Sequence, residues 1–230
     1  MTRASKFRLL IDPPTDGVTN MAVDEALLAA AHEPGALPVL RWYRWSEPTL
    51  SLGYFQRWND VPRLLQSLPR VRRSTGGGAI LHDNELTYSI VFPEGTWPRK
   101  LASEVVADMH EAVADELGVH DFSRFAGGEQ VRLRMEEPFL CFDRRSPNDL
   151  VVGADKIMGS AQRRQGGRLL QHGSIKLRGM EPNELIERVT KILAKRWCVS
   201  FTPATLTDAE AALVDELAAK HRSIEWNHRR

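Results

Sequence analysis

The chain has 230 residues, of which 42% are hydrophobic and 27% are charged, and its formal net charge is +1. This composition is ordinary for a globular protein, and the length allows a substantial core in one large domain or two small ones. A net charge so close to zero gives no global signature of polyanion binding. Arginines nevertheless gather in three places, which we interpret either as solvated faces or as sites for acidic partners or anionic ligands: Arg70, Arg72 and Arg73; Arg144 and Arg145; and Arg163, Arg164 and Arg168.

The cysteine and histidine patterns bear on compartment and on metal binding. Cys141 and Cys198 lie far apart and form neither a C-x-x-C pattern nor a disulfide framework, so a reducing cytoplasm is the expected location. The N-terminus lacks the long apolar core of a signal peptide, and no stretch approaches the roughly 20 apolar residues that span a bilayer. The histidines are scattered, and no recognised nucleic-acid module occurs. We therefore expect no metal site, no nucleic-acid partner and no membrane partner.

The first elements are a strand and a helix. Residues 7–12 form a short, largely apolar strand that two prolines close. Asn20 is a good N-cap for an amphipathic helix that continues to about His32. Asp24 and Glu25 lie in the early turns of this helix, where negative charge suits the helix dipole.

Strands and a longer helix follow. Residues 39–43 and 49–52 are expected to pair as two strands joined by a short turn. Residues 86–92 alternate and are rich in aromatic and β-branched side chains, which predicts a further strand. The apolar spacing of residues 100–117 predicts a helix, and Gly118 is a plausible stop for it.

A glycine run lies between these segments. Arg72 and Arg73 precede residues 76–78, all glycine, and the apolar residues 79–81 then lead to His82. Glycines allow another molecule to approach the main-chain N–H groups closely, and the arginines supply fixed positive charge. A plain glycine-rich turn between two strands is the structural alternative. A phosphate loop is disfavoured because no Lys-Ser or Lys-Thr pair follows the glycines.

The second half of the chain begins with residues 122–137, which are polar and poorly patterned, as is typical of a mobile loop or a bulged hairpin. We predict three consecutive strands after it, at 150–152, 156–162 and 168–177, with glycine-containing turns between them. Two amphipathic helices follow, at 182–197 and 207–221. We expect residues 1–230 to form one α+β domain in which helices flank a mixed or antiparallel sheet, with C-terminal helices from about residue 182.

Three side chains are candidates for chemistry. Lys156 begins a strand between two glycines and is either an exposed turn lysine or a cation aimed into a cavity. His172 stands beside a glycine in an apolar strand and is either a structural histidine or a site residue. Cys141 lies in apolar company and is an inert buried thiol by default. Positive charge from Arg144, Arg145 or Lys156 would instead make it a nucleophile.

Several motifs agree in order and spacing with a known family. Residues 72–82 resemble the R-R-x-[ST]-G-G-G/R-A-V-x-H signature of lipoate–protein ligases and octanoyltransferases. Residues 156–162 and 170–175 look like the second block of that family, K-I-x-G-S-A-Q followed by L-Q-H-G-S-I, and residues 20–26 and 48–56 are further matches. The resemblance implies the class II synthetase-like catalytic-domain fold that biotin and lipoate ligases share.

Within the family, the chain is most similar to the cysteine-dependent octanoyl-[acyl carrier protein]:protein N-octanoyltransferases. Residues 85–89 resemble the corresponding segment of that subgroup, and residues 138–143 resemble the loop that carries its nucleophilic cysteine. The accessory C-terminal domain of many lipoate ligases is not expected. Two features resemble the ligases instead: Gly78 stands where the transferases often have arginine, and residues 148–150 read N-D-L.

The resemblance implies a role in protein lipoylation and lipoate biosynthesis. An octanoyl group would move from acyl carrier protein, through a thioester on Cys141, to a lysine of a lipoyl domain. The acceptor would be glycine cleavage H protein or a 2-oxo acid dehydrogenase subunit, and no cofactor would be needed. Lys156 would support the Cys141 thiolate and the developing oxyanion. The substrate pocket would be lined by Arg73, Gly76, Gly77, Gly78, His82, Ser160, Gln162 and His172.

The main alternative is a lipoate–protein ligase that uses ATP and Mg to make lipoyl-adenylate. Lys156 would then contact the activated carboxyl–phosphate, Asn148 and Asp149 would serve the nucleotide and metal, and Cys141 would be incidental. A biotin ligase is a more distant alternative. A lipoyl-domain binding protein without activity is a third, which the presence of Lys156 and the glycines disfavours.

Overall fold

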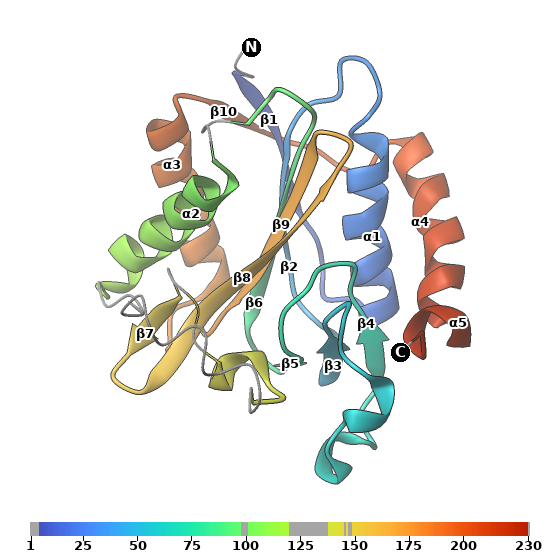
Figure 1. The fold of residues 1–230 in the computed structure, drawn as a ribbon. Coiled ribbons are helices and arrows are strands. Elements are labelled where there is room, and N and C mark those ends of the chain that lie inside the picture. The colour runs from blue at the N-terminus through green and yellow to red at the C-terminus, as the bar shows by residue number, and fades with distance from the viewer. Residues whose placement is uncertain (1–4, 98–100, 120–137, 145, 147–148, 230) are drawn as a thin grey trace.

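The computed structural model describes residues 5–97, 101–119, 138–144, 146 and 149–229. These residues form an α+β architecture in which a large mixed sheet lies between helices, with a smaller sheet beside it (Figure 1). Residues 122–137, for which the sequence predicts a mobile loop or a bulged hairpin, lie outside the described residues, and so do Arg145 and Asn148. In the part of the chain that the structure describes, no helix is both long and apolar enough to cross a membrane.

The large sheet combines parallel and antiparallel strands. Its strands in the described ranges are β1 (Lys6–Ile11), β2 (Val39–Tyr43), β6 (Leu86–Phe92), β7 (Leu150–Val152), β8 (Asp155–Gln165), β9 (Arg168–Ile175) and β10 (Ser200–Pro203). They lie in the order β10–β1–β2–β6–β9–β8–β7. The pairs β10–β1 and β1–β2 are parallel, and the other pairs are antiparallel. The fold class predicted from the sequence is therefore confirmed.

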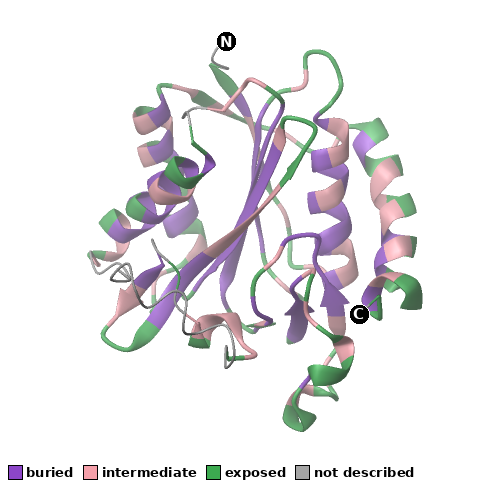
Figure 2. Cartoon of the chain, viewed as in Figure 1, coloured by how far each residue is buried: buried purple, intermediate pink, exposed green. Residues whose placement is uncertain are grey.

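Helices cover both faces of this sheet. They are α1 (Gly17–Ala30), α2 (Ala102–Leu117), α3 (Pro182–Trp197), α4 (Asp208–Arg222) and the short α5 (Ile224–Asn227). The main core lies between one face of the sheet and helices α2 and α3. A second core lies between the other face and α1, with α4 packed outside α1. Figure 2 shows the buried residues on the sheet and on the inner faces of these helices.

Local sequence chemistry accounts for the long β8–β9 hairpin and for the helix ends. Gly166 and Gly167 have φ values of +54° and +75°, which a two-residue type I′ hairpin turn requires. Gly118 ends α2 in the left-handed conformation at φ +62°, as the sequence predicts. Thr207 and Glu210 form a capping box at the start of α4.

The smaller sheet carries the glycine run. It consists of β3 (Thr49–Leu52), β4 (Arg70–Arg72) and β5 (Ile80–His82), in the order β4–β3–β5. Leu50, Leu52, Val61 and Ala79 form its core, and Phe139 and Leu140 pack against them. The segment before Cys141 is therefore anchored on the sheet that holds the glycines.

Two predictions of local structure are wrong, and one strand is missed. Residues 39–43 and 49–52 do form strands, but β2 pairs with β1 and β6, whereas β3 pairs with β4 and β5 in the other sheet. Asn20 does not cap the first helix, because α1 begins one turn earlier and Asp16 accepts hydrogen bonds from its first N–H groups. The edge strand β10 is not anticipated by any pattern, since its four residues are mostly exposed.

Glu25 belongs to an ion-pair cluster between α1 and α4, beyond the dipole contact expected of it. Its carboxylate lies 2.5 Å from Lys220 Nζ and 3.0 Å from His221 Nε2. Burial alone would raise the pKa of Glu25, but the hydrogen bonds with His221 and Lys220 outweigh burial and lower it to about 2. A carboxylate with a depressed pKa stabilises the fold above its ordinary pKa, and that stabilisation is lost as the pH falls through the depressed value.

We expect Glu25→Gln to lower the free energy of unfolding at pH 7 by about 2–3 kcal/mol. The difference from wild type should shrink as the pH falls from about 4.5 towards 2, where the wild-type carboxylate also becomes protonated. Denaturant unfolding at several pH values measures this. Glu187→Gln, which removes an exposed pair with Lys191, is the matched control and should leave the unfolding midpoint unchanged. Equal effects of the two variants would contradict the prediction.

Candidate active site

A cavity of about 610 Å³ lies where the two sheets meet, and its size is that of a small-molecule site. Its walls come from α1, the smaller sheet, the glycine run, the Cys141 segment and strands β6, β8 and β9. The lining includes most of the residues that the sequence singles out: Arg73, Gly77, Gly78, His82, Cys141, Asp149, Lys156, Ser160 and His172. Gly76 and Gln162 are not part of it.

Cys141, Lys156 and Asp149 form a compact group on one wall. Lys156 is 3% exposed, and its Nζ lies 3.6 Å from Cys141 Sγ and 3.2 Å from the Cys141 carbonyl oxygen. The same Nζ lies 2.8 Å from Asp149 Oδ2, which also accepts a hydrogen bond from the Ser146 backbone N–H. The exposed-lysine alternative is therefore wrong, since a buried ammonium bridges a thiol and a carboxylate.

Gly159 makes this arrangement possible. The Lys156 side chain folds back over it, so a Cβ on Gly159 would lie 2.4 Å from Lys156 Cε and 2.7 Å from Nζ. Cβ atoms do not approach other heavy atoms so closely. Gly159 is thus the residue over which the lysine reaches both Asp149 and Cys141.

Arg73 holds the glycine run in place through hydrogen bonds to its carbonyl oxygens. Its guanidinium donates to the carbonyl oxygens of Gly76 at 2.8 Å, of Gly78 at 2.6 Å and of Ser51 at 3.0 Å. Its Nε makes no hydrogen bond within the described residues. Burial lowers the pKa of Arg73 to about 10, although the negative charge of a Cys141 thiolate opposes the shift. The side chain therefore keeps its positive charge at pH 7, close to Cys141.

Ala79, directly after the glycine run, is hydrogen-bonded to the cysteine segment. Cys141 N donates to the Ala79 carbonyl oxygen at 2.6 Å, and Ala79 N donates to the Phe139 carbonyl oxygen at 3.0 Å. A Cβ on Gly78 would lie 2.9 Å from Cys141 N and 3.0 Å from Cys141 Cα. A Cβ on Gly76 would meet only Phe55 ring atoms, at 3.7 Å and beyond.

These contacts predict that alanine is tolerated at position 76 but not at position 78 of the same loop. Gly78→Ala should displace the Cys141 backbone and slow its alkylation and acylation by about 100-fold, because small misplacements of reacting groups carry penalties of that order. Gly76→Ala should react at nearly the wild-type rate. Iodoacetamide labelling of Cys141, followed by mass spectrometry, compares the two variants. Equal reactivity of both would show that close packing at Gly78 does not position the cysteine.

A second polar group borders the cavity at His82. His82 Nδ1 bonds Glu85, its Nε2 lies 2.8 Å from Ser51 Oγ, and its ring stacks on Trp45 at a centroid distance of 3.7 Å. Burial lowers the pKa of His82 in spite of the Glu85 carboxylate, so the ring is neutral at pH 7. Because Glu85 accepts from Nδ1, Nε2 is the acceptor for the Ser51 hydroxyl.

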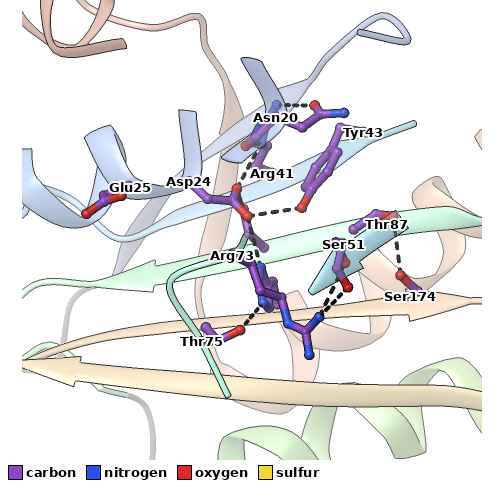
Figure 3. A network of polar contacts seen from close by, with 12 residues as sticks. Asn20, Asp24, Glu25, Arg41, Tyr43, Ser51, Arg73, Thr75, Thr87 and Ser174 are labelled. Carbon is purple, nitrogen blue, oxygen red and sulfur yellow. Dashed lines mark hydrogen bonds and ion pairs between the residues drawn. The ribbon is translucent and has the colours of Figure 1, made fainter. Parts of the chain in front are cut away.

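His172 connects the cavity to a buried ion-pair network around Asp24 and Arg41, two residues that Figure 3 shows. Its Nδ1 lies 3.1 Å from Asp24 Oδ2, and its Nε2 lies 2.6 Å from Thr75 Oγ1, just before the glycines. Asp24 also pairs with Arg41 at 2.8 Å and accepts from the Tyr43 hydroxyl at 3.0 Å. The network therefore fixes the start of the glycine run to α1 and β2.

The side chains of Ser160 and Gln162, also predicted to line the pocket, bond to neighbouring strands and helices of the large sheet. The Ser160 hydroxyl lies 2.6 Å from both Tyr88 Oη and His110 Nε2. Gln162 donates to the Ala102 carbonyl oxygen and to Gln171. Ser160 therefore borders the cavity while its hydroxyl is engaged elsewhere, and the Gln162 side chain links β8 to the start of α2.

The chain resembles known proteins along most of its length. The family model described as lipoyl protein ligase A/B catalytic domain matches residues 16–220. The chain belongs to this family. It is 33% identical to the octanoyltransferase LipM of Moorella thermoacetica, with 99% of each chain covered. It is also 33% identical to the octanoyltransferase LipM of Staphylococcus aureus, with 94% of this chain and 95% of that protein covered.

Solved lipoate–protein ligases share the fold of this family member. A putative lipoate protein ligase from T. acidophilum with bound lipoic acid superposes with a TM-score of 0.76 at 24% identity, covering 99% of this chain and 100% of that chain. A lipoate-protein ligase A bound with ATP gives a TM-score of 0.76 at 23% identity, covering 99% of each chain. At these identities the likeness concerns the fold.

Sequence reasoning missed several polar residues of this lipoyl ligase-family site. Asp149 was expected only beside an adenylate, yet it pairs with Lys156 across the β7–β8 turn, where Val151 is in register with Lys156. Glu85 follows His82 by three residues, a spacing that brings the two together across a tight turn. Asp24 and Thr75 lie inside the matched motifs, but their partner His172 is distant in sequence. Asn148 lies outside the described residues.

Proposed function

We propose that this chain is a protein N-octanoyltransferase that works through a thioester on Cys141. The observation that carries the proposal is the position of the Lys156 ammonium, 3.6 Å from Cys141 Sγ, within a cavity of about 610 Å³. A buried cation beside a thiol stabilises the thiolate, which is the nucleophilic form. Curated relatives named octanoyltransferase LipM match along the full chain and support the same activity.

The first half-reaction loads the cysteine. The Cys141 thiolate attacks the carbonyl carbon of an octanoyl thioester, and the carbonyl oxygen becomes an oxyanion. Lys156, a hydrogen-bond donor next to the sulfur, stabilises that oxyanion. When the oxyanion collapses, the bond from carbon to the donor sulfur breaks, the donor leaves as a thiol after taking up a proton, and Cys141 holds the octanoyl group.

The second half-reaction releases it to a lysine. A neutral ε-amine attacks the Cys141 thioester, a C–N bond forms, and the bond from carbon to Cys141 Sγ breaks. The amine loses a proton to solvent or to the departing thiolate, and Cys141 is regenerated. Splitting one acyl transfer into two thioester steps lowers the barrier of each. The apolar side chains of Met21 and Ile80 in the cavity lining suit a medium-length acyl tail.

We propose that the donor is octanoyl-acyl carrier protein and that the acceptor is a lipoyl domain, such as glycine cleavage H protein or a 2-oxo acid dehydrogenase subunit. The thioester bond itself supplies the free energy for amide formation, so the proposed reaction requires no cofactor. A nucleophilic thiol must stay reduced, which supports a cytoplasmic site of action.

The ligase alternative has less support. It assigns Asp149 to an adenylate and a metal, whereas this carboxylate lies 2.8 Å from Lys156 Nζ. It also leaves Cys141 without a role, although the sulfur lines the cavity beside the lysine. The residues thus fit a thioester intermediate better than they fit a magnesium nucleotide.

Turnover with defined substrates tests the proposal. The protein is incubated with a lipoyl domain and either octanoyl-carrier protein without ATP or free lipoate with ATP and Mg. Octanoylation of the lipoyl-domain lysine without ATP is expected. Modification only with ATP and free lipoate would establish the ligase instead, and binding without modification under both conditions would indicate a non-catalytic protein.

A further inference from the structure

A surface rich in arginine and aromatic side chains lies outside the cavity. The arginine–aromatic surface comprises residues 54–70, Arg163 and residues 223–229. The Arg229 guanidinium lies 4.1 Å from the ring centroid of Tyr54 and 5.0 Å from that of Trp226. On the same surface, Arg70 lies 4.3 Å from the Trp58 ring centroid, and the His228 ring stacks on the Trp58 ring at a centroid distance of 4.4 Å.

Positive charge predominates on this surface. It carries five arginines, Arg57, Arg63, Arg70, Arg163 and Arg229, against two acidic residues, Asp60 and Glu225. Within the described ranges, none of these arginines forms an ion pair with a carboxylate. Arg188 and Arg196 on α3, by contrast, pair with glutamates or aspartates. Aromatic stacking holds Arg70 and Arg229 without neutralising them, so their charge remains available to a partner.

The surface adjoins the catalytic segments. Tyr54 N donates to the Thr75 carbonyl oxygen at 2.8 Å, and Arg163 Nη1 donates to the Ser74 carbonyl oxygen at 3.1 Å, so both residues border the glycine run. Gln56 Nε2 donates to the Phe139 carbonyl oxygen at 3.1 Å, two residues before Cys141. Phe55 is 64% exposed beside Gly76. Figure 1 shows α5 and the C-terminus next to β4, on the side of the molecule away from α2 and α3.

We infer that the arginine–aromatic surface docks the protein that delivers the acyl group, an acidic carrier whose thioester arm contains a phosphodiester. This inference rests on the proposed function. Forked guanidinium groups bind phosphate and carboxylate oxygens, and Phe55 offers an apolar contact next to the loop that the arm must pass. The anionic arm of the donor is complementary in charge to this surface.

Acylation kinetics with two donors test the inference. The double variant Arg57→Glu/Arg229→Glu is compared with wild type and with Arg188→Glu, which makes a single charge reversal on α3, across the large sheet. With octanoyl-carrier protein at low ionic strength, we expect the double variant to lose about tenfold or more in the second-order acylation rate and to show a weaker salt dependence. With a small octanoyl thioester that lacks the carrier, all three proteins should react alike, because the cavity is unchanged.

Further readouts separate the outcomes. An unchanged rate of the double variant with the carrier donor would overturn the inference. Slowed transfer from the isolated acyl-enzyme to the lipoyl domain, with normal acylation, would mean that the surface docks the acceptor and would also overturn it. Slow reaction with the small donor as well would show damage to the glycine run. The rate with the carrier donor is then measured for Arg70→Glu, which does not contact that loop: a slower rate supports the inference, and an unchanged rate overturns it.

Binding of holo carrier protein to the Cys141→Ala protein, with and without the charge reversals, measures docking without chemistry. Weaker binding after charge reversal supports the inference, and equal binding contradicts it. This result is independent of thioester formation. A wild-type protein that binds the carrier through the arginines but forms no thioester with either donor would contradict the proposed function and leave the docking surface supported.

Discussion

Lys156→Ala is expected to slow acylation of Cys141 by about 10³-fold, because removing one preorganised donor to an oxyanion typically has an effect of that order. The substitution removes the cation 3.6 Å from the sulfur and takes the ion-pair partner from Asp149. Stopped-flow acylation with octanoyl-carrier protein measures the rate. Wild-type rates in the variant would remove Lys156 from the mechanism.

Gly159→Ala is a companion variant that keeps the lysine. Its new Cβ would occupy the space of Lys156 Cε and Nζ, so the ammonium must leave its place beside Cys141 and Asp149. A loss approaching that of Lys156→Ala is expected, with the free energy of unfolding measured in parallel. A fast Gly159→Ala variant beside a slow Lys156→Ala variant would show that the position of the lysine is less restricted than its contacts indicate.

Asp24→Asn is expected to lower the free energy of unfolding by about 3 kcal/mol at pH 7, since it leaves a buried guanidinium without one of its carboxylates. Burial alone would raise the pKa of Asp24, but the hydrogen bond to His172 and the charge of Arg41 outweigh burial and lower it. The stabilisation is therefore present above the ordinary carboxyl pKa near 3.8 and fades as the pH falls through the lowered value.

A matched control exists on the same arginine. Asp12 also pairs with Arg41, at 2.7 Å, but its side chain is 25% exposed, against 3% for Asp24. Asp12→Asn should therefore destabilise the fold less than Asp24→Asn in denaturant titrations. Asp24→Asn should in addition loosen Thr75 through His172, which hydrogen exchange at the glycine run would detect. A larger effect of the Asp12 variant would contradict the role assigned to Asp24.

Much of the fold follows from local sequence. The β8–β9 hairpin is predicted because Gly166 and Gly167 supply a turn between alternating strands. The helices α3 and α4 are predicted because their apolar spacing and ends agree. The pairing partners of β2 and β3 are not predicted correctly, because strand pairing depends on contacts between segments that are distant in sequence. The N-cap at Asp16 is also missed, because Gly17 and Val18 after it are poor helix formers.

The candidate site divides in the same way. The motif resemblance brings Cys141, Lys156 and the glycines to attention, and the structure places them around one cavity. The burial of Lys156 could not be predicted, because position alone favours an exposed lysine at a turn. The need for glycine at positions 78 and 159 could not be predicted either. Gly78 faces the backbone of Cys141 from another segment, and Gly159 faces the folded-back side chain of Lys156.

The most direct measurement of the thioester mechanism is the intact mass of the protein after incubation with octanoyl-carrier protein in the absence of ATP. We expect a single octanoyl adduct that hydroxylamine removes, that maps to the peptide containing Cys141, and that Cys141→Ala does not form. An unmodified wild-type protein, or an adduct that persists undiminished in Cys141→Ala, would contradict the mechanism.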